Sequence, residues 1–298
     1  MKVLLFGKTG QVGWELQRSL QTLGELVAVD HDSTELAGDF SRPDAVAQTV
    51  RQLKPDIIVN AAAHTAVDKA ESEPELARLL NAETPGAIAR EAAACGAWLM
   101  HYSTDYVFDG SGTTPWTEDA PTGPLSVYGR TKLEGEEAIR ASGCKHLIFR
   151  TSWVYAARGG NFAKTMLRLA QERERLTVID DQFGAPTGAD LLADLTVHAL
   201  RMAQRDVTLT GTYHAAPAGI TTWHGYASFV VGLARQLGVP VKVAADAIAP
   251  VPTSAFPTPA RRPSNSRLDT TRLRQAFGVE LPQWQIGVER MLTEVLGR

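Results

Sequence analysis

The chain has 298 residues, of which 44% are hydrophobic and 21% are charged, and its formal net charge at pH 7 is -3. These values are typical of a soluble globular protein with one large α/β unit or two closely joined domains. The small net charge gives no electrostatic reason to expect a nucleic acid or an anionic membrane as a partner. Two cysteines, Cys95 and Cys144, are too few for a disulfide framework or a cysteine-based zinc site, and they favour the reduced cytoplasm as the setting.

The N-terminus predicts a buried strand rather than a targeting segment. The apolar run over residues 3–6 ends at Gly7, which makes it too short for the apolar region of a secretory signal. Elsewhere no stretch approaches the roughly 20 apolar residues that a membrane span needs. Residues 2–6 instead have the pattern of a strand buried in a parallel sheet.

A glycine-rich turn follows this strand. Gly7, Gly10 and Gly13 precede an amphipathic helix that we predict over residues 14–23. A strand, a glycine turn and a helix in this order are the context of a dinucleotide site. Gly7 permits the tight turn, Gly10 lets the backbone approach a pyrophosphate, and Gly13 lets the helix pack on the strand. We expect the pyrophosphate at the helix N-terminus, where free N–H groups and the helix dipole favour an anion.

Asp30 ends the second predicted strand, residues 26–29. An acid here can accept a hydrogen bond from a ribose 2′-hydroxyl and would repel a 2′-phosphate, although a helix-capping or loop role is the alternative. His31 and Lys8 lie close by in the sequence and leave the choice between NAD and NADP open. We interpret residues 38–40 as the loop after a third short strand, beside the adenine.

Further buried strands are predicted over residues 56–60, 98–102 and 147–151, and helices lie between them. Strands that alternate with helices imply right-handed crossovers and a doubly wound parallel sheet. In such a sheet, ligand-binding and catalytic groups lie at the carboxyl ends of the strands.

Tyr128 and Lys132 are the predicted catalytic pair. They are four residues apart, so on a helix they share one face. A lysine ammonium beside a phenol favours the phenolate, which lets tyrosine exchange protons nearer neutral pH. Thr104, which follows a predicted strand, can add a hydroxyl at the same place. Together these groups predict an acid/base centre for interconverting a carbonyl and an alcohol, although an isolated Tyr-x-x-x-Lys match is more often a solvated helix face.

These motifs together resemble the extended short-chain dehydrogenase/reductases and, within them, the dTDP-4-dehydrorhamnose reductase family. The resemblance covers nearly the whole chain in colinear order. The segments that carry it are GKTGQVG (7–13), NAAAHTAVD (60–68), STDYVF (103–108), RTSWVY (150–155), DQFGAPT (181–187) and RPSNSRLD (262–269).

The resemblance implies a Rossmann-type doubly wound parallel sheet with a smaller, discontinuous α+β lobe that binds the nucleotide sugar. It also implies that NADPH or NADH reduces the 4-keto group of dTDP-4-dehydro-L-rhamnose, the last step in making dTDP-L-rhamnose for cell-surface polysaccharide. In the family pattern Tyr128 donates the proton, Lys132 tunes it and holds the nicotinamide ribose, and Thr104 assists. The implied cofactor-binding residues are Gly7, Gly10, Gln11, Val12, Gly13, Asp30, Asp39, Phe40, Ala63, His64, Thr65, Tyr128 and Lys132.

The implied substrate-binding residues are Thr104, Asp105, Tyr106, Trp153 and Arg262. The indole of Trp153 can stack on a sugar face, and a guanidinium such as that of Arg262 suits a diphosphate. For these two residues a core role and a solvated-loop role remain the respective alternatives. We predict a dinucleotide-binding domain over residues 1–150, to which 172–220 return, and a nucleotide-sugar lobe made of 151–171 and 221–298.

The resemblance further implies a homodimer, and in some relatives a Mg²⁺ ion at the dimer interface. The acids at the matching positions are Glu15, Asp190 and Glu294. Oxygen ligands suit Mg²⁺, but three acids so far apart in the sequence do not by themselves predict a site.

Two other functions remain open. One is an epimerase or another reductase that acts on a different nucleotide sugar, because epimerases share the glycine turn and the Tyr-x-x-x-Lys pair. The other is a non-catalytic regulatory subunit on the same fold. The intact Thr104, Tyr128 and Lys132 argue against the second, since a binding module needs no acid/base pair.

Overall fold

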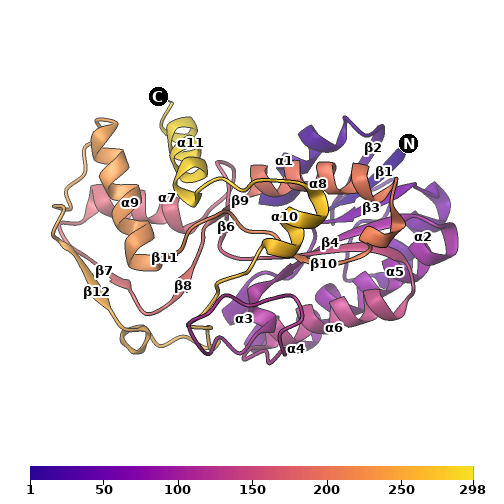
Figure 1. Ribbon diagram of the computed structural model, residues 1–298, viewed down its shortest axis with the longest axis horizontal. Helices are drawn as coiled ribbons and strands as arrows, with labels where there is room; N and C mark the ends of the chain where they lie inside the picture. Colours follow the sequence, from indigo (N-terminus) through magenta and orange to yellow (C-terminus); the bar gives the residue numbers. More distant parts are fainter. Residues whose placement is uncertain (298) are drawn as a thin grey trace.

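A computed structural model describes residues 1–297 and shows two lobes (Figure 1). The larger lobe is built on a six-stranded sheet, in the order β10-β5-β4-β3-β1-β2, in which every neighbouring pair is parallel. This arrangement confirms the predicted parallel sheet. The strands are β1 (Lys2–Phe6), β2 (Glu25–Val29), β3 (Ile57–Asn60), β4 (Trp98–Thr104), β5 (Lys145–Thr151) and β10 (Gly211–His214).

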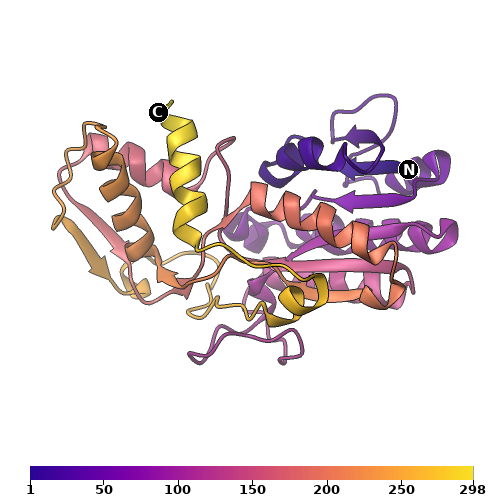
Figure 2. The same cartoon turned by 45° about the horizontal axis from the view of Figure 1, so that its top comes forward.

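Helices cover both faces of this sheet (Figure 2). One face carries α1 (Gln11–Leu20), α8 (Ala189–Ala203) and α10 (Thr271–Phe277), and the other carries α2 (Pro43–Leu53), α5 (Thr84–Cys95) and α6 (Val127–Ala141). Along β1, Val3 and Leu5 pack into the first layer, whereas Leu4 and Phe6 pack into the second. Successive side chains of a strand point to opposite faces, so burial on both faces explains the unbroken apolar run.

The strand order reverses between β1 and β3, and the predicted third short strand is wrong. From β2 the chain passes through turns, residues 31–42, directly into α2. Gly38 lies against the backbone of Asp30, and a Cβ on Gly38 would stand 2.5 Å from the Asp30 carbonyl oxygen. The segment folds back on the end of β2 instead of adding to the sheet. The reversal leaves a crevice at the carboxyl ends of β1 and β3, which is where open α/β sheets bind their ligands.

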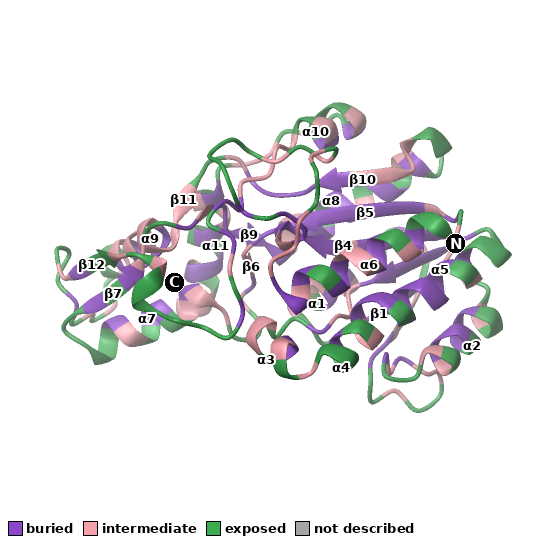
Figure 3. Ribbon diagram, turned by 90° about the horizontal axis from the view of Figure 1, so that it is seen from below, coloured by how far each residue is buried: buried purple, intermediate pink, exposed green. Residues whose placement is uncertain are grey.

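The smaller lobe has its own core, made by three helices and one pair of strands. Figure 3 shows the buried inner surfaces of both lobes and their exposed outer faces. No helix in the described part of the chain is long and apolar enough to cross a lipid bilayer. The elements of this lobe are α7 (Phe162–Glu172), α9 (Trp223–Gln236), α11 (Trp284–Leu296), β7 (Leu176–Ile179) and β12 (Ile248–Val251).

Two segments pack differently from the predicted domain boundaries. Strand β7 pairs with β12 in the smaller lobe, although it falls within the range 172–220 that we assigned to the sheet domain. Helix α10 buries Leu273 and Phe277 against the sheet side of the larger lobe, although it falls within 221–298. The chain therefore crosses between the lobes more often than the sequence predicts, because each amphipathic segment packs where a partner surface exists.

A buried ion pair joins the helix that carries Tyr128 to the sheet. Arg150 on β5 donates two hydrogen bonds to Glu136 on α6, from Nε at 2.9 Å and from Nη2 at 2.7 Å. The Glu136 side chain is 0% exposed. Burial opposes its ionisation, but the hydrogen bonds and charge of Arg150 outweigh burial and hold the pKa of Glu136 below its usual value. The position of α6 on the sheet depends on this pair.

We predict that Arg150→Met lowers the free energy of unfolding by about 3 kcal/mol, because it leaves a buried carboxylate without its main partner. Urea denaturation measures the change. Arg168→Met is the matched control, since Arg168 pairs with Glu172 on an exposed helix face, and such pairs contribute about 0.5 kcal/mol or less. Equal losses of unfolding free energy in the two variants would contradict the stabilising role of the buried pair between Arg150 and Glu136.

Candidate active site

A cleft of about 720 Å³ lies at the carboxyl edge of the sheet. It gathers most of the predicted site residues from β1, β3, β4 and α6, and it extends to the start of the smaller lobe. The predicted residues that line it are Gly7, Gly10, Gln11, Val12, Asp30, Asp39, Phe40, Ala63, Thr65, Thr104, Asp105, Tyr106, Tyr128, Lys132 and Trp153. Three of the predicted catalytic, cofactor-binding and substrate-binding residues do not line it: Gly13, His64 and Arg262.

The glycine turn lets three backbone segments approach each other. Gly7 has φ of +82°, and a Cβ there would stand 2.7 Å from the amide nitrogen of Ala62. A Cβ on Gly13 would stand 1.9 Å from the Gly7 carbonyl oxygen, so Gly13 serves the packing of helix on strand and lies behind the cleft. Helix α1 begins at Gln11, three residues before the predicted start, and no side chain caps its N-terminus. Free N–H groups at an open helix end beside small residues fit a dinucleotide pyrophosphate.

Asp30 stands at the edge of the same cleft, and its carboxylate is already well bonded. Oδ2 accepts from the Thr9 amide at 2.8 Å and from the Thr9 hydroxyl, while Oδ1 accepts from the His31 amide at 2.8 Å. Burial opposes ionisation, but these hydrogen bonds prevail and lower the pKa of Asp30 to about 2. The His31 ring also contacts Oδ1, at 3.0 Å, and its side chain is 76% exposed. Asp30 is therefore a fixed anion with an exposed imidazole beside it.

Tyr128 lies in the first turn of α6 and faces Thr104 at the end of β4. Burial raises the pKa of the Tyr128 phenol to about 12, although a hydrogen bond with the Thr104 hydroxyl opposes the shift. The Tyr106 ring packs edge-on against it, with ring centroids 5.5 Å apart. A phenol with a raised pKa holds its proton at neutral pH, which is the state required of a proton donor.

Lys132 lies one turn further along α6, but its contacts differ from the prediction. Its Nζ donates to the Tyr102 carbonyl oxygen at 2.7 Å and lies 3.2 Å from Nε2 of His101. Burial lowers the pKa of Lys132 to about 8. Burial shifts both groups toward their uncharged forms, but a pKa of about 8 leaves Lys132 largely protonated at pH 7. The effect of its ammonium group on Tyr128 stays a prediction.

Asp105 follows Thr104 and is 1% exposed. Its Oδ2 has no hydrogen-bond partner among the described residues, and burial raises the pKa of this carboxyl to about 6. An unpaired buried carboxyl oxygen in the cleft can accept a hydrogen bond from a ligand hydroxyl.

Two tryptophans form the wall toward the smaller lobe. Trp153 has φ of +50°, a left-handed conformation that is uncommon for a bulky residue, and its ring stacks on Trp223 with centroids 3.7 Å apart. Trp223, which begins α9 and lines the cleft, is not among the residues predicted from the sequence. It also lines a second cavity, of about 510 Å³, together with Gln182 and Arg262. Trp153 and Trp223 meet only in the folded chain, and no spacing in the sequence predicts their contact.

Arg262 lies in that second cavity, where it bridges the lobes. Its guanidinium donates to both carboxylate oxygens of Asp68, at 2.8 and 3.2 Å. Asp68 lies on α3 (Val67–Ser72), which follows β3 in the larger lobe. His64 is buried, and its backbone N–H donates a hydrogen bond to Oδ1 of Asn81 at 2.8 Å. This contact indicates that His64 supports the loop in which it lies.

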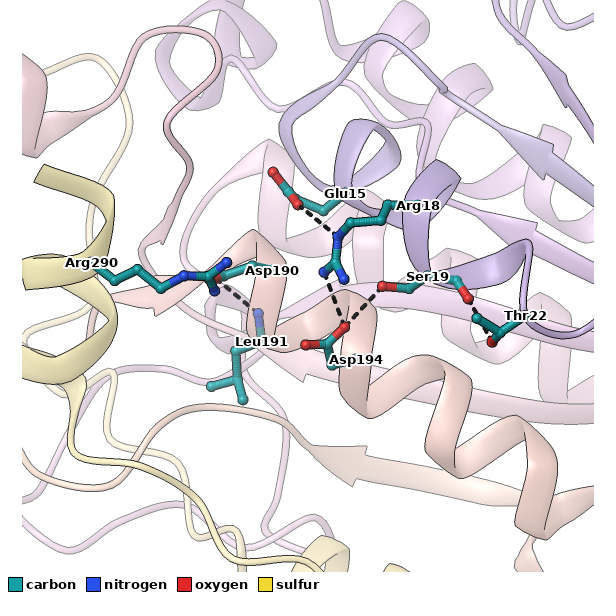
Figure 4. A network of polar contacts seen from close by, with 8 residues as sticks. All are labelled: Glu15, Arg18, Ser19, Thr22, Asp190, Leu191, Asp194 and Arg290. Carbon is teal, nitrogen blue, oxygen red and sulfur yellow. Dashed lines mark hydrogen bonds and ion pairs between the residues drawn. The ribbon is translucent and has the colours of Figure 1, made fainter. Parts of the chain in front are cut away.

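Figure 4 shows two of the three acids of the implied Mg²⁺ site, Glu15 and Asp190, each with an arginine beside it. Asp190 pairs with Arg290 at 2.5 Å, and Arg18 lies 3.9 Å from Glu15. Burial, followed by the charge of Asp190 and more weakly that of Glu294, raises the pKa of Glu15. Within residues 1–297 no group of three or more His, Cys, Asp or Glu side chains is placed to hold a metal ion. One chain therefore does not assemble this site by itself.

Comparisons with known proteins agree with the resemblance. The family model described as the RmlD substrate binding domain matches residues 1–296. The dTDP-4-dehydrorhamnose reductase of Escherichia coli (strain K12) is 61% identical over 295 residues, which cover 99% of this chain and 98% of that protein.

Two solved structures of dTDP-4-dehydrorhamnose reductases are each 34% identical to this chain. The one from Clostridium acetobutylicum has a TM-score of 0.88 and covers 100% of both chains. The one from Bacillus anthracis, in complex with NADP, has a TM-score of 0.86 and covers 98% of this chain and 99% of that chain. The resemblance stated from the sequence is thus confirmed, and the chain belongs to the RmlD substrate binding domain family.

Proposed function

We propose that this protein is an NAD(P)H-dependent reductase that converts dTDP-4-dehydro-L-rhamnose into dTDP-L-rhamnose, the last step of dTDP-rhamnose synthesis. The observation that carries the proposal is the convergence of Tyr128, Thr104 and Lys132 on a cleft with an uncapped helix N-terminus. The high identity to reductases of this name supports the substrate.

The reaction adds a hydride and a proton to a ketone. The bound dinucleotide supplies the hydride. Tyr128 donates its proton to the carbonyl oxygen as negative charge develops there, and the Thr104 hydroxyl donates a hydrogen bond to the same oxygen. Lys132 lies one helical turn from Tyr128 and binds the nicotinamide ribose. Asp105 accepts from a sugar hydroxyl through its free oxygen.

The nucleotide part of the substrate fits the second cavity. Its walls include Phe162, Met166 and Trp223, and its rim includes Arg262. Flat apolar walls suit a base, and a guanidinium suits a diphosphate. Because Trp223 lines both cavities, the sugar lies on the Trp153 side and the nucleotide on the other. Arg262 then exchanges one bond to Asp68 for a bond to the diphosphate.

An epimerase on the same fold is the competing function. Epimerases keep NAD tightly bound through the catalytic cycle, whereas a reductase releases its oxidised cofactor. Purified protein that carries stoichiometric NAD would favour the epimerase. A cofactor-oxidation assay with the dTDP-linked and UDP-linked 4-keto-6-deoxy sugars tests the reductase directly.

We predict that Tyr128→Phe lowers kcat by about 100-fold or more, because it removes the proton donor, which typically contributes 10²–10⁴ in rate. Folding and cofactor binding are expected to be unchanged, as checked by thermal unfolding and by cofactor fluorescence titration. Tyr213→Phe is the control, because the Tyr213 hydroxyl donates to the Leu209 carbonyl oxygen at 2.8 Å and does not line the cleft. Near-normal turnover by Tyr128→Phe would remove Tyr128 from the mechanism.

From the position of Asp30 we predict that the enzyme uses NADH competently. Asp30→Asn is expected to shift the ratio of kcat/KM for NADPH over NADH toward NADPH by about tenfold, since it removes a charge that repels the 2′-phosphate. His31→Ala tests the opposite effect: an exposed imidazole beside Asp30 favours a phosphate, so this variant loses NADPH use selectively. A strict NADPH requirement of the unmodified enzyme would contradict the role given to Asp30.

We also propose a homodimer formed through the face that carries α1, α8 and α11, in the cytoplasm. Trp14 on α1 and Ile286 on α11 are exposed large apolar side chains, at 46% and 59%. Covering such side chains by a second copy would remove apolar surface from water. A second copy would bring its own Glu15, Asp190 and Glu294 to the same face, where a Mg²⁺ ion can offset the excess of carboxylates over arginines.

We predict that Trp14→Glu converts the dimer to a monomer, as measured by light scattering after size exclusion. Treatment with a chelator is expected to lower the dimer fraction, and added Mg²⁺ to restore it. Glu25→Gln, which lies outside this face on β2, is the control. A dimer that is indifferent to the chelator would exclude the metal, and a monomeric native protein would exclude the interface.

A further inference from the structure

A chain of hydrogen bonds links the Trp223 indole to the loop that follows β7. The indole N–H of Trp223 donates to Oε1 of Gln182 at 3.0 Å, and Nε2 of Gln182 donates to Oγ1 of Thr253 at 3.0 Å. The Thr253 hydroxyl in turn donates to Oδ1 of Asp181 at 2.5 Å. Gln182 is 3% exposed, and it is not among the predicted site residues. The chain thus runs from the wall of the cleft to a carboxylate at the surface.

The chemistry of the four groups fixes the direction of this chain. An indole N–H can only donate, so the side-chain oxygen of Gln182 must face Trp223 and its NH₂ group must face Thr253. That NH₂ group also can only donate, so the Thr253 hydroxyl accepts from it and gives its own proton to Asp181. The backbone N–H of Thr253 donates to both carboxylate oxygens, each at 2.9 Å, and holds that end. The Gln182 amide therefore has one allowed orientation.

The backbone brings Gln182 and Trp223 together. Strand β8 (Phe183–Gly184) pairs antiparallel with β11 (Thr221–Thr222), and Thr222 lies opposite the first residue of β8. Gln182 precedes β8 and Trp223 follows β11, so the two residues are neighbours across this pair. The Thr222 side chain also caps the N-terminus of α9. Strand pairing and the cap fix the backbone of Trp223, but the orientation of its ring needs a side-chain partner.

Stacking alone does not supply that orientation. The Trp153 ring lies nearly parallel to the Trp223 ring, at an interplanar angle of 17°, and the Phe162 ring lies 4.6 Å from it between centroids. Trp153 in turn rests on β8, since a Cβ on Gly184 would stand 3.0 Å from Cε2 of that indole. A turned Trp223 ring could still stack, but its N–H would point away from Gln182. The hydrogen bond is directional and therefore selects one orientation.

We propose that Gln182 is a positioning residue that holds the Trp223 indole as a partition between the two cavities. Trp223 lines both of them. The inference rests on the proposed function, in which a nucleotide sugar spans both cavities, so the orientation of this ring sets how well the two halves of the substrate fit together. Gln182 also lines the second cavity, and direct contact between Gln182 and the nucleotide is the alternative that the tests must exclude.

Circular dichroism tests the orientation without any substrate. Two stacked indoles couple their electronic transitions and give a paired band of opposite signs, which we expect in the unmodified protein and expect to disappear in Trp223→Phe. Gln182→Met has a side chain of similar length but no acceptor, so it weakens the paired band while thermal unfolding shows a folded protein. An unchanged band in Gln182→Met would overturn the proposal.

A second variant breaks the chain further from the tryptophan. Thr253→Val leaves the bond between Gln182 and Trp223 but removes the group that orients the Gln182 amide, so we expect a smaller loss of the paired band. Thr165→Val is the matched control, because the Thr165 hydroxyl bonds only within α7, to the Asn161 carbonyl oxygen at 3.0 Å. Equal effects of Thr253→Val and Thr165→Val would contradict the role given to the chain.

Steady-state kinetics tests the effect on the substrate. Gln182→Met is expected to raise KM for the dTDP-linked 4-keto sugar about tenfold, the equivalent of one lost hydrogen bond, and to leave kcat unchanged. A rise in KM alone reports lost binding, whereas a general loss of structure lowers kcat as well. The dissociation constant of dTDP, measured by calorimetry, is expected to rise in parallel. Loss of kcat with an unchanged KM would overturn the proposal.

A double-mutant cycle separates action through the indole from direct contact. If Gln182 acts through Trp223, Gln182→Met adds little to the KM of a protein that already carries Trp223→Phe, because the indole N–H is gone. If Gln182 contacts the nucleotide itself, the two effects on the binding free energy add, and that result would overturn the proposal.

The readouts also distinguish the proposal from the proposed function. The kinetic measurements depend on the reductase activity, whereas the dichroism spectra do not. A protein whose spectra change as expected, but which neither binds dTDP nor reduces the dTDP-linked ketone, would contradict the proposed function alone.

Discussion

Burial of the central sheet on both faces is the constraint on which the rest of this structure depends. Six parallel strands covered by two helical layers leave few polar positions inside the sheet, and a charged group there is paired, as Arg150 is with Glu136. The polar groups that face the cleft gather where the strands end. Gly7, Asn60 and Thr104 occupy the carboxyl ends of three adjacent strands. Because the strand order reverses between β1 and β3, these ends open onto one crevice. The cleft forms there, and no additional structural element is needed to create it.

The same burial governs the chemistry of the site. Tyr128, Lys132 and Asp105 all shift toward their uncharged forms, because the surrounding protein solvates charge poorly. At pH 7 a pKa of about 12 keeps Tyr128 neutral, whereas pKa values of about 6 and 8 leave Asp105 largely ionised and Lys132 largely protonated. Negative charge develops on the ketone oxygen during reduction, and fixed partners such as Thr104 then stabilise it. Asp30 is the exception, since hydrogen bonds from Thr9 and His31 hold its charge at the outer end of the cleft.

The smaller lobe completes the site at its open side. Its tryptophan Trp223 stacks on Trp153, which belongs to the segment that leaves the sheet. Arg262 ties the lobe back to Asp68 across the gap. Both contacts therefore join the two lobes beside the cleft.

The sequence by itself determined the parallel sheet, the glycine turn and the placing of Thr104, Tyr128 and Lys132 at one edge. These features are local: strand and helix periodicity, a turn that only glycine permits, and two residues one helical turn apart. Tertiary structure alone decided the exchange of β7 and α10 between the lobes, the partnership of Trp153 with Trp223, and the chain of hydrogen bonds from Trp223 to Asp181. Each of these depends on side chains from distant segments that meet only after packing.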